Sequence, residues 1–136
     1  MIFLDTNVVC EPTRAKADQE VVAWINKFGA DLAISTVVLA EISFGIERLK
    51  PELRSKRLSN FLDDTRKIFI SKIYAFDDES ALIFGKIMGQ AFHTGRTMKT
   101  ADAMIAAITL RHKASLATRN VVDFDFLEIM LVNPWS

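Results

Sequence analysis

Cysteine and histidine are scarce in this sequence of 136 residues, with one cysteine, Cys10, and two histidines. A single cysteine forms no internal disulfide and cannot build a cysteine-based zinc site, so any bound metal is expected to be held by oxygen atoms. No apolar run reaches the roughly 18 residues of a membrane span, and residues 1–5 meet a carboxylate too early for a signal peptide. We therefore expect a cytoplasmic protein.

Net charge is also absent, since 17 Lys and Arg balance 17 Asp and Glu. No global field therefore indicates a nucleic-acid-binding protein. Positive charge is nevertheless concentrated between Arg48 and Lys72, where eight basic residues stand against three acidic ones, a local balance of +5. Such a stretch is either a solvated helix face or an approach surface for an anionic partner.

Glycine and proline are few, with five and three copies, and no linker, repeat or low-complexity tract divides the chain. Hydrophobic residues make up 50% and charged residues 25% of the sequence, as in ordinary globular proteins, so we expect one domain over residues 1–136. Five short, largely apolar segments are typical of strands that are covered on both faces. They are residues 2–5, 32–35, 73–76, 115–118 and 129–133.

Helical patterns fill the intervals between these strands. The expected helices are residues 21–28, residues 36–49 capped by Ser35 or Thr36, a third from Pro51 to Ile68, a fourth that begins at residues 77–79 and stops at Gly95, and a last one over residues 101–112 capped by Thr100. Strands that alternate with helices predict a layered α/β fold, in which ligands bind beyond the carboxyl ends of the strands.

Two acidic residues stand close to the first two strand ends. Asp5 ends the first strand, where an aspartate is also a common turn residue. Glu41 lies in the helix after the second strand, on the flank of an apolar stripe and beside Gly45, which leaves open space. A partly buried glutamate needs a partner there, whereas the plainer explanation is a side chain that curls to solvent.

Two further acids belong to the second half of the chain. Asp102 is the one acid in a helix that is apolar nearly all round, although its first-turn position also complements the helix dipole. Asp123 follows the fourth strand, and position alone does not separate it from Asp125 or Glu128. An acid in this loop is ordinary by itself.

Together, the four acids approach one edge of a parallel sheet with no histidine or cysteine among them. Carboxylates held within about 4 Å repel by roughly 4 kcal/mol per pair at an effective dielectric near 20, so such a group takes up protons or binds a cation. An all-oxygen cluster suits Mg²⁺ or Mn²⁺, the usual device for attack of water on a phosphodiester. With the basic stretch, this predicts a nuclease that has an acidic site and a positive approach surface.

The same segments carry a resemblance to a known family. The sequence resembles the PIN-domain toxins, and more closely their VapC and FitB-like branch, from Met1 to Trp135 in the correct order and spacing. Each segment alone is a weak signal, and the set is specific. The matching segments are Phe3–Asn7, Ser35–Ile42 with Gly45–Leu49, Ala101–Ala107, Thr118–Phe124 and the ending Leu131–Trp135.

This resemblance implies a mostly parallel five-stranded sheet flanked by helices, commonly in a homodimer. It implies an Mg²⁺- or Mn²⁺-dependent endoribonuclease that is the toxin of a type II toxin–antitoxin pair. A cognate antitoxin would block the site and bring the complex to promoter DNA, so that contact with DNA is indirect.

Carried over residue by residue, the resemblance also implies roles for the site. Asp5 and Asp102 would be the main direct metal ligands, and Glu41 and Asp123 would act directly or through metal-bound water. An asparagine would orient a carboxylate by a hydrogen bond. The neighbouring polar positions are Thr6, Asn7, Thr118 and Asn120.

One departure from the family pattern concerns the loop before the last helix. Relatives often have proline there, whereas this chain has Arg96–Thr100. Lys99 in this loop is expected to neutralise part of the acidic site or to touch a substrate phosphate. The full set of expected substrate-approach residues is Arg48, Lys50, Arg54, Lys56, Arg57 and Lys99.

Two alternatives stand beside the nuclease hypothesis. The first is a catalytically weak module that acts mainly as a protein partner in a DNA-bound toxin–antitoxin repressor complex. The second is a phosphatase of the haloacid dehalogenase type, which needs a second aspartate two residues after the first; that position is Asn7 here. The intact acids argue against a pure binding role, because a binding surface does not need them at all four places.

Overall fold

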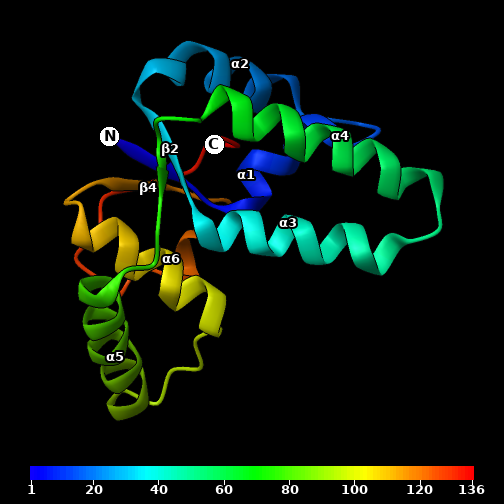
Figure 1. Cartoon of the computed structure of the whole chain (residues 1–136). Coiled ribbons are helices and arrows are strands. Elements are labelled where there is room, and N and C mark those ends of the chain that lie inside the picture. Colours follow the sequence, from blue (N-terminus) through cyan, green and yellow to red (C-terminus); the bar gives the residue numbers. More distant parts are fainter.

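The computed structural model describes the whole chain, residues 1–136, and its elements alternate between strands and helices (Figure 1). The strands are β1 (Ile2–Leu4), β2 (Leu32–Ser35), β3 (Ile73–Tyr74), β4 (Ser115–Ala117) and β5 (Leu131–Val132). The α-helices are α1 (Thr6–Cys10), α2 (Gln19–Phe28), α3 (Thr36–Leu49), α4 (Leu53–Ile68), α5 (Asp78–His93) and α6 (Thr100–Arg111). Three short 3₁₀ turns are η1 (Glu11–Thr13), η2 (Gly29–Asp31) and η3 (Val121–Asp123).

The five strands form one sheet in the order β3-β2-β1-β4-β5, and every neighbouring pair is parallel. This confirms the predicted α/β class and the five-stranded parallel sheet. In Figure 1, α2 and α4 lie above the strands and α5 and α6 below them. Parallel strands need such crossovers, which cover both faces of the sheet. Their carboxyl ends all meet at one edge, where β1, β2 and β4 deliver the segments of interest.

The core is formed by the strands β1, β2 and β4 with the helices α1, α3, α5 and α6. Phe3, Ile34 and Leu116 are almost completely buried, each from a different strand. Alanines and isoleucines make up most of the buried face of α6, where Ala106 and Ile108 are both fully buried. Each large apolar side chain buried in this way contributes about 1.5–3 kcal/mol. This packing fixes α6, and therefore its first turn, against the sheet.

Several helix boundaries follow the predicted capping residues. The Ser35 hydroxyl accepts a hydrogen bond from the Val38 backbone N–H (3.3 Å) and begins α3, and the Asp77 carboxylate accepts one from the Ser80 N–H (2.8 Å) and begins α5. Satisfying these free N–H groups is what stabilises a helix start. Gly95 follows the end of α5 with a φ of +71°, as expected for a residue that stops a helix.

Other boundaries differ from the prediction. Thr100 is the first residue of α6 and not its cap, because Lys99 occupies the capping position without a side-chain bond. The helix α4 begins at Leu53 and not at Pro51, since the chain turns once more after α3. The short helix α1 was not predicted at all. No helix of the structure combines the length and apolar character that a membrane crossing requires.

Candidate active site

Asp5 lies at the carboxyl end of β1 and is 5% exposed. Its carboxylate accepts two hydrogen bonds, one from the Thr6 backbone N–H (2.9 Å) and one from the Thr118 hydroxyl (2.7 Å). Burial raises the pKa of Asp5 above its usual value, these two bonds lower it, and the nearby charges of Glu41 and Asp123 raise it again. The side chain is therefore fixed in position and surrounded by further negative charge.

Thr118 ties the segment after β4 to this carboxylate. The hydroxyl that donates to Asp5 also accepts a hydrogen bond from the Asn120 backbone N–H (3.1 Å), and Thr118 is fully buried. Asp5 and Thr118 are 113 residues apart in sequence and meet because β1 and β4 are adjacent parallel strands. The pairing of these strands thus places a donor on a buried acid.

Glu41 approaches from α3 and is exposed. Its Oε1 atom accepts a hydrogen bond from the Thr6 hydroxyl (2.6 Å). Thr6 is the first residue of α1, directly after Asp5, so its backbone contacts one acid and its side chain contacts another. The link between α1 and α3 holds Glu41 beside Asp5 in place of letting it extend freely into solvent.

Asp102 lies half-buried in the first turn of α6. Its pKa is raised to about 6, first by burial and then by the negative charges of Asp5 and Asp123, with a smaller effect from Glu41; Lys99 opposes these effects. A carboxyl group shows such a shift when like charges surround it. The structure therefore brings the four acids, from four separate segments, within electrostatic range of one another.

The loop after β4 distinguishes the acids that position alone left open. Arg96 donates from Nη2 to the Val122 carbonyl (2.8 Å) and to Asp125 Oδ1 (3.0 Å), so Asp125 forms an ion pair. Asp123 carries a charge that raises the pKa of both Asp5 and Asp102. Asp123 is thus the loop acid that faces the cluster.

The donor set is consistent with a hard divalent cation in its chemistry. All available groups are oxygen atoms, which Mg²⁺ and Mn²⁺ prefer, and neighbouring negative charges add to the effect of burial in raising the pKa of Asp5 and of Asp102. The buried Oδ1 atom of Asn7, two residues after Asp5, has no hydrogen-bond partner and remains free to accept one. No three Asp, Glu, His or Cys side chains are placed closely enough to hold an ion as they stand.

The polar residues beside the acids were expected to include an asparagine, Asn7 or Asn120, that orients a carboxylate, but threonines do this in the structure. Neither asparagine side-chain amide donates a hydrogen bond to a carboxylate here, and Asn120 contributes its backbone N–H to Thr118. The hydroxyls of Thr6 and Thr118 make these bonds to the acids. A hydroxyl is a donor that does not compete for a cation as a charged group would.

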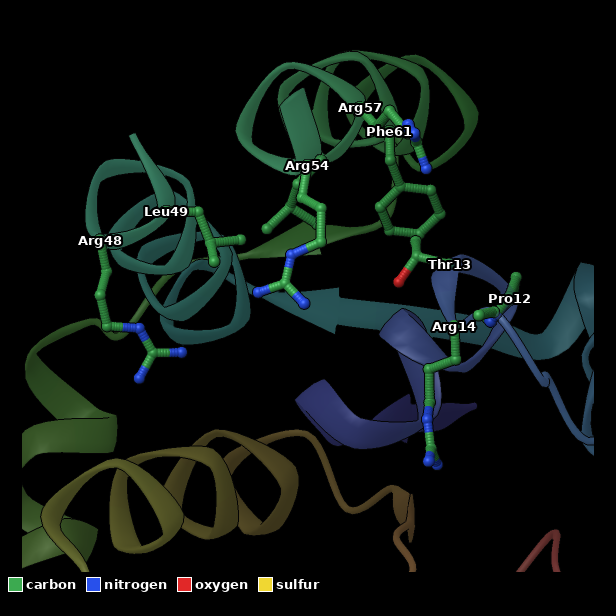
Figure 2. A pocket seen from close by; sticks show the side chains of 10 residues that line it. Pro12, Thr13, Arg14, Arg48, Leu49, Arg54, Arg57 and Phe61 are labelled. Atoms are coloured by element: carbon green, nitrogen blue, oxygen red, sulfur yellow. The ribbon is translucent and has the colours of Figure 1, made fainter. Parts of the chain in front are cut away.

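The six expected substrate-approach residues do not form one surface. Three of them, together with Arg14, line an open pocket of about 680 Å³ between α3, α4 and η1, which we call the arginine pocket (Figure 2). Lys50 forms an ion pair with Glu47 (3.0 Å). Lys50 and Lys56 both line a second hollow, separate from the arginine pocket. Lys99 lies apart, close enough to Asp102 to lower its pKa. The three in the arginine pocket are Arg48, Arg54 and Arg57.

Sequence reasoning did not identify Arg14 and Arg96 as part of these surfaces. Arg14 was missed because it lies outside the basic stretch, although it follows closely on the Asp5 segment. Arg96 was missed because its bonds to Val122 and Asp125 span 26 and 29 residues. Burial raises the pKa of the Cys10 thiol to about 11, so this thiol is a packing group without nucleophilic character.

Comparison with known proteins gives a consistent picture. The chain matches the sequence profile of the PIN domain over residues 2–126. It is 32% identical to "Toxin FitB" of Neisseria gonorrhoeae over 137 residues, which cover 99% of each chain. It is 31% identical to "VapC ribonuclease Y4jK" of Sinorhizobium fredii over 138 residues, which cover 100% of this chain and 99% of that one.

A solved structure shares the fold along the whole chain. The structure of FitAB bound to an IR36 DNA fragment contains a chain that is 31% identical to this one, with a TM-score of 0.91. The superposition covers 100% of this chain and 96% of that one. The five-stranded sheet and the helices that flank it are therefore those of the matched domain.

Proposed function

The chain belongs to the PIN-domain family, and on that premise we propose that it is a ribonuclease and the toxin of a type II toxin–antitoxin pair. The proposal is carried by one observation: Asp5, Glu41, Asp102 and Asp123, from four separate segments, lie within electrostatic range of one another at the carboxyl edge of the sheet, where burial and then the neighbouring negative charges raise the pKa of Asp5 and of Asp102. The relatives named as a toxin and as a VapC ribonuclease support the same assignment.

We further propose that the site uses Mg²⁺ or Mn²⁺. Asp5 and Asp102 would hold the ion directly, and Glu41 and Asp123 would hold it directly or through water. A bound divalent cation supplies an activated water and neutralises charge on the leaving oxygen of a phosphodiester.

The chain's own residues prepare this site before anything binds. Thr118 holds the Asp5 carboxylate in one orientation, and Thr6 holds Glu41 beside it. Fixed ligands need no reorganisation during the reaction, which is the main advantage of a preorganised site. Burial of Asp5 excludes water from one side of the carboxylate, so its charge acts at short range on whatever enters the site.

The proposal includes partners. The similar solved chain belongs to a FitAB complex bound to DNA, so we infer a cognate antitoxin that covers the acidic site and makes the contact with DNA. We also infer a homodimer of about twice 15.3 kDa, measurable by light scattering after size exclusion. An enzyme that cleaves cellular RNA acts where that RNA is, which places it in the cytoplasm.

The direct test is cleavage of a labelled single-stranded RNA with added Mg²⁺ or Mn²⁺. We expect Asp5→Asn and Asp102→Asn each to lower the rate at least about a hundredfold, because each removes a charge from the site. The matched control is Glu128→Gln, which removes an exposed acid from the same loop region as Asp123. Full activity of either aspartate variant, or undiminished activity in excess EDTA, contradicts the proposed mechanism.

The alternative of a catalytically weak binding module is less well supported. The four acids are intact, and two of them are held by threonine hydroxyls, a feature that a docking surface does not require. A relative 31% identical over the full chain is named a ribonuclease. The cleavage assay decides between these functions, since a binding module would show no metal-dependent turnover.

A further inference from the structure

We propose that the arginine pocket is a second binding site for the RNA substrate, taking a backbone phosphate and a base at a distance from the bond that is cut. This inference rests on the proposed ribonuclease function and adds a subsite to it. The pocket lies between α3, α4 and η1, away from the four acids, and none of its lining residues belongs to the acidic cluster.

The charge of the pocket is of one sign. Four arginines line it and no carboxylate does. Arg48 and Arg57 have no acidic partner, and Arg54 has only an exposed ion pair with Glu52 (3.4 Å). Exposed ion pairs of this kind are weak, about 0–1 kcal/mol. The pocket therefore presents guanidinium groups that are largely free to bind an anion, and a guanidinium fork matches phosphate geometry.

Arg14 is the most firmly held of the four. Its Nη1 atom contacts both carboxylate oxygens of Glu11 at 3.3 and 3.4 Å, and Glu11 is 2% exposed. A buried acid thus positions this arginine at the edge of η1, while the arginine itself remains exposed. The position of one of the four guanidinium groups is therefore fixed by a buried carboxylate.

The floor of the pocket is apolar. Leu49, Leu58 and Phe61 line it between the arginines. In Figure 2 the ring of Phe61 points from α4 toward Thr13, and the guanidinium of Arg54 points into the space between α3 and η1. Proteins that bind single-stranded nucleic acid combine such cations with an aromatic ring on which a base stacks. The combination suits a nucleotide, with its phosphate on arginine and its base on the floor.

The position of the pocket relative to the acids favours RNA over a separate partner. Glu41 and Arg48 are seven residues apart on α3, on one face of the helix and about 10 Å apart along its axis. From Asp5, α1 and η1 lead to Arg14 over roughly 13 Å. Two elements thus run from the acidic site to the pocket, and one RNA strand can reach both.

The test is binding of a fluorescent single-stranded RNA, U12, to the whole protein in EDTA, followed by anisotropy at several salt concentrations. We expect Arg54→Ala with Arg57→Ala to raise the Kd at least about tenfold at low salt. The slope of log affinity against log salt should fall by about 0.7, because the two arginines together neutralise one phosphate of the bound strand and each single-strand phosphate accounts for about 0.7. Phe61→Leu should weaken binding at least about fivefold without changing the slope, because stacking is not ionic.

The matched control is Arg66→Ala with Lys67→Ala, which removes the same charge from exposed positions of the same helix outside the pocket. We expect a change of less than about twofold. If the control and the pocket variant lose affinity equally, binding depends on general charge and the subsite proposal is overturned.

Two further outcomes separate this inference from the proposed function. If the pocket variant binds U12 like the wild type but loses affinity for a labelled oligoglutamate peptide, the pocket is a protein-docking site and the subsite proposal fails, while metal-dependent cleavage by the wild type still supports the ribonuclease. If the wild type neither binds nor cleaves RNA, the proposed function itself fails, and the subsite with it.

Discussion

The hydroxyl of Thr118 makes the most specific single contact in the site, because it bonds to a carboxylate that is almost completely buried. A hydrogen bond to a buried charge is worth about 1.5–3 kcal/mol, more than one between neutral groups. We expect Thr118→Val, which keeps the shape and removes the donor, to lower the free energy of unfolding by that amount at neutral pH. It should also raise the pKa of Asp5 further, since the bond favours the charged form.

Urea denaturation at pH 7.5 measures the stability change, and carbon NMR of the Asp5 carboxyl group measures its titration. Thr118→Ser is the control, because it retains the donor and removes only a methyl group. Equal stability losses in the valine and serine variants, with no change in the Asp5 titration, would show that packing and not the hydrogen bond is responsible.

Asp102 gives the site a pH dependence with a definite sign. Its folded-state pKa of about 6 is higher than the ordinary 3.8, so the folded protein holds this proton more tightly than the unfolded chain does. The stabilising contribution is present below pH 4 and is lost as the pH rises through 6. Asp102→Asn should therefore be more stable than wild type at pH 7.5 by on the order of 1 kcal/mol, after screening of a half-buried group.

The measurement is the difference in unfolding free energy between Asp102→Asn and wild type, in chelator, at several pH values from 4 to 7.5. The difference should grow between pH 4 and 6 and remain constant above that range. Glu128→Gln serves as a comparison in which no such growth is expected. A difference that is independent of pH would mean that Asp102 is not strained by its neighbours.

At the scale of elements, the helices α3 and α4 pack against each other at Gly45. From the sequence, Gly45 was expected to leave open space beside Glu41. The structure shows instead that a Cβ atom at Gly45 would lie 3.6 Å from Leu58 Cδ2. This is an ordinary van der Waals distance. We expect Gly45→Ala to be tolerated and to raise stability by about 0.5–1 kcal/mol, because glycine disfavours the helix interior by that amount.

Gly95 offers the opposite case after α5. Its φ of +71° is a left-handed conformation, which alanine adopts only with strain, although nothing lies within 4 Å of its Cβ position. Gly95→Ala should lower stability by on the order of 1 kcal/mol. Thermal melts of both variants test the pair. Changes of the same sign in the two variants would contradict the expectation that alanine is tolerated at Gly45, inside a helix, and strained at Gly95, where φ is positive.

For the molecule as a whole, the sequence predicts which segments form helices and strands better than it predicts the residues at which they begin and end. The segment 32–35 is predicted with its true bounds, whereas the first strand is one residue too long because Asp5 leaves the sheet to cap α1. The helix α1 has five residues, too few to show an apolar periodicity. Parallel pairing follows from the alternation of strands and helices, whereas the order β3-β2-β1-β4-β5 does not.

The partners within the site are where sequence reasoning stops. Asp102 stands out as the one acid in an apolar helix, whereas the other three acids are identified only as a set and by the family resemblance. The contact between Asp5 and Thr118 depends on which strands pair. The basic side chains between Arg48 and Lys72 point in different directions. Some line the arginine pocket, some line the second hollow and others face solvent, according to the face of α3 or α4 on which each lies. Charge along the sequence does not specify such faces when helices pack at an angle.

A cation at the acidic site would connect four segments of the chain, and this connection provides the last prediction. A ligand that binds only the folded state adds RT ln(1 + [L]/Kd) to stability, about 2.7 kcal/mol at a hundredfold excess over Kd. Mg²⁺ or Mn²⁺ should therefore raise the melting temperature of the EDTA-dialysed protein by several degrees, at constant ionic strength set with KCl. The rise should disappear in Asp5→Asn and remain in Glu128→Gln, because only the first removes a donor from the cluster. An equal rise in Asp5→Asn would mean that the ion binds elsewhere, and the absence of any rise in wild type would mean that the acids balance their repulsion by taking up protons.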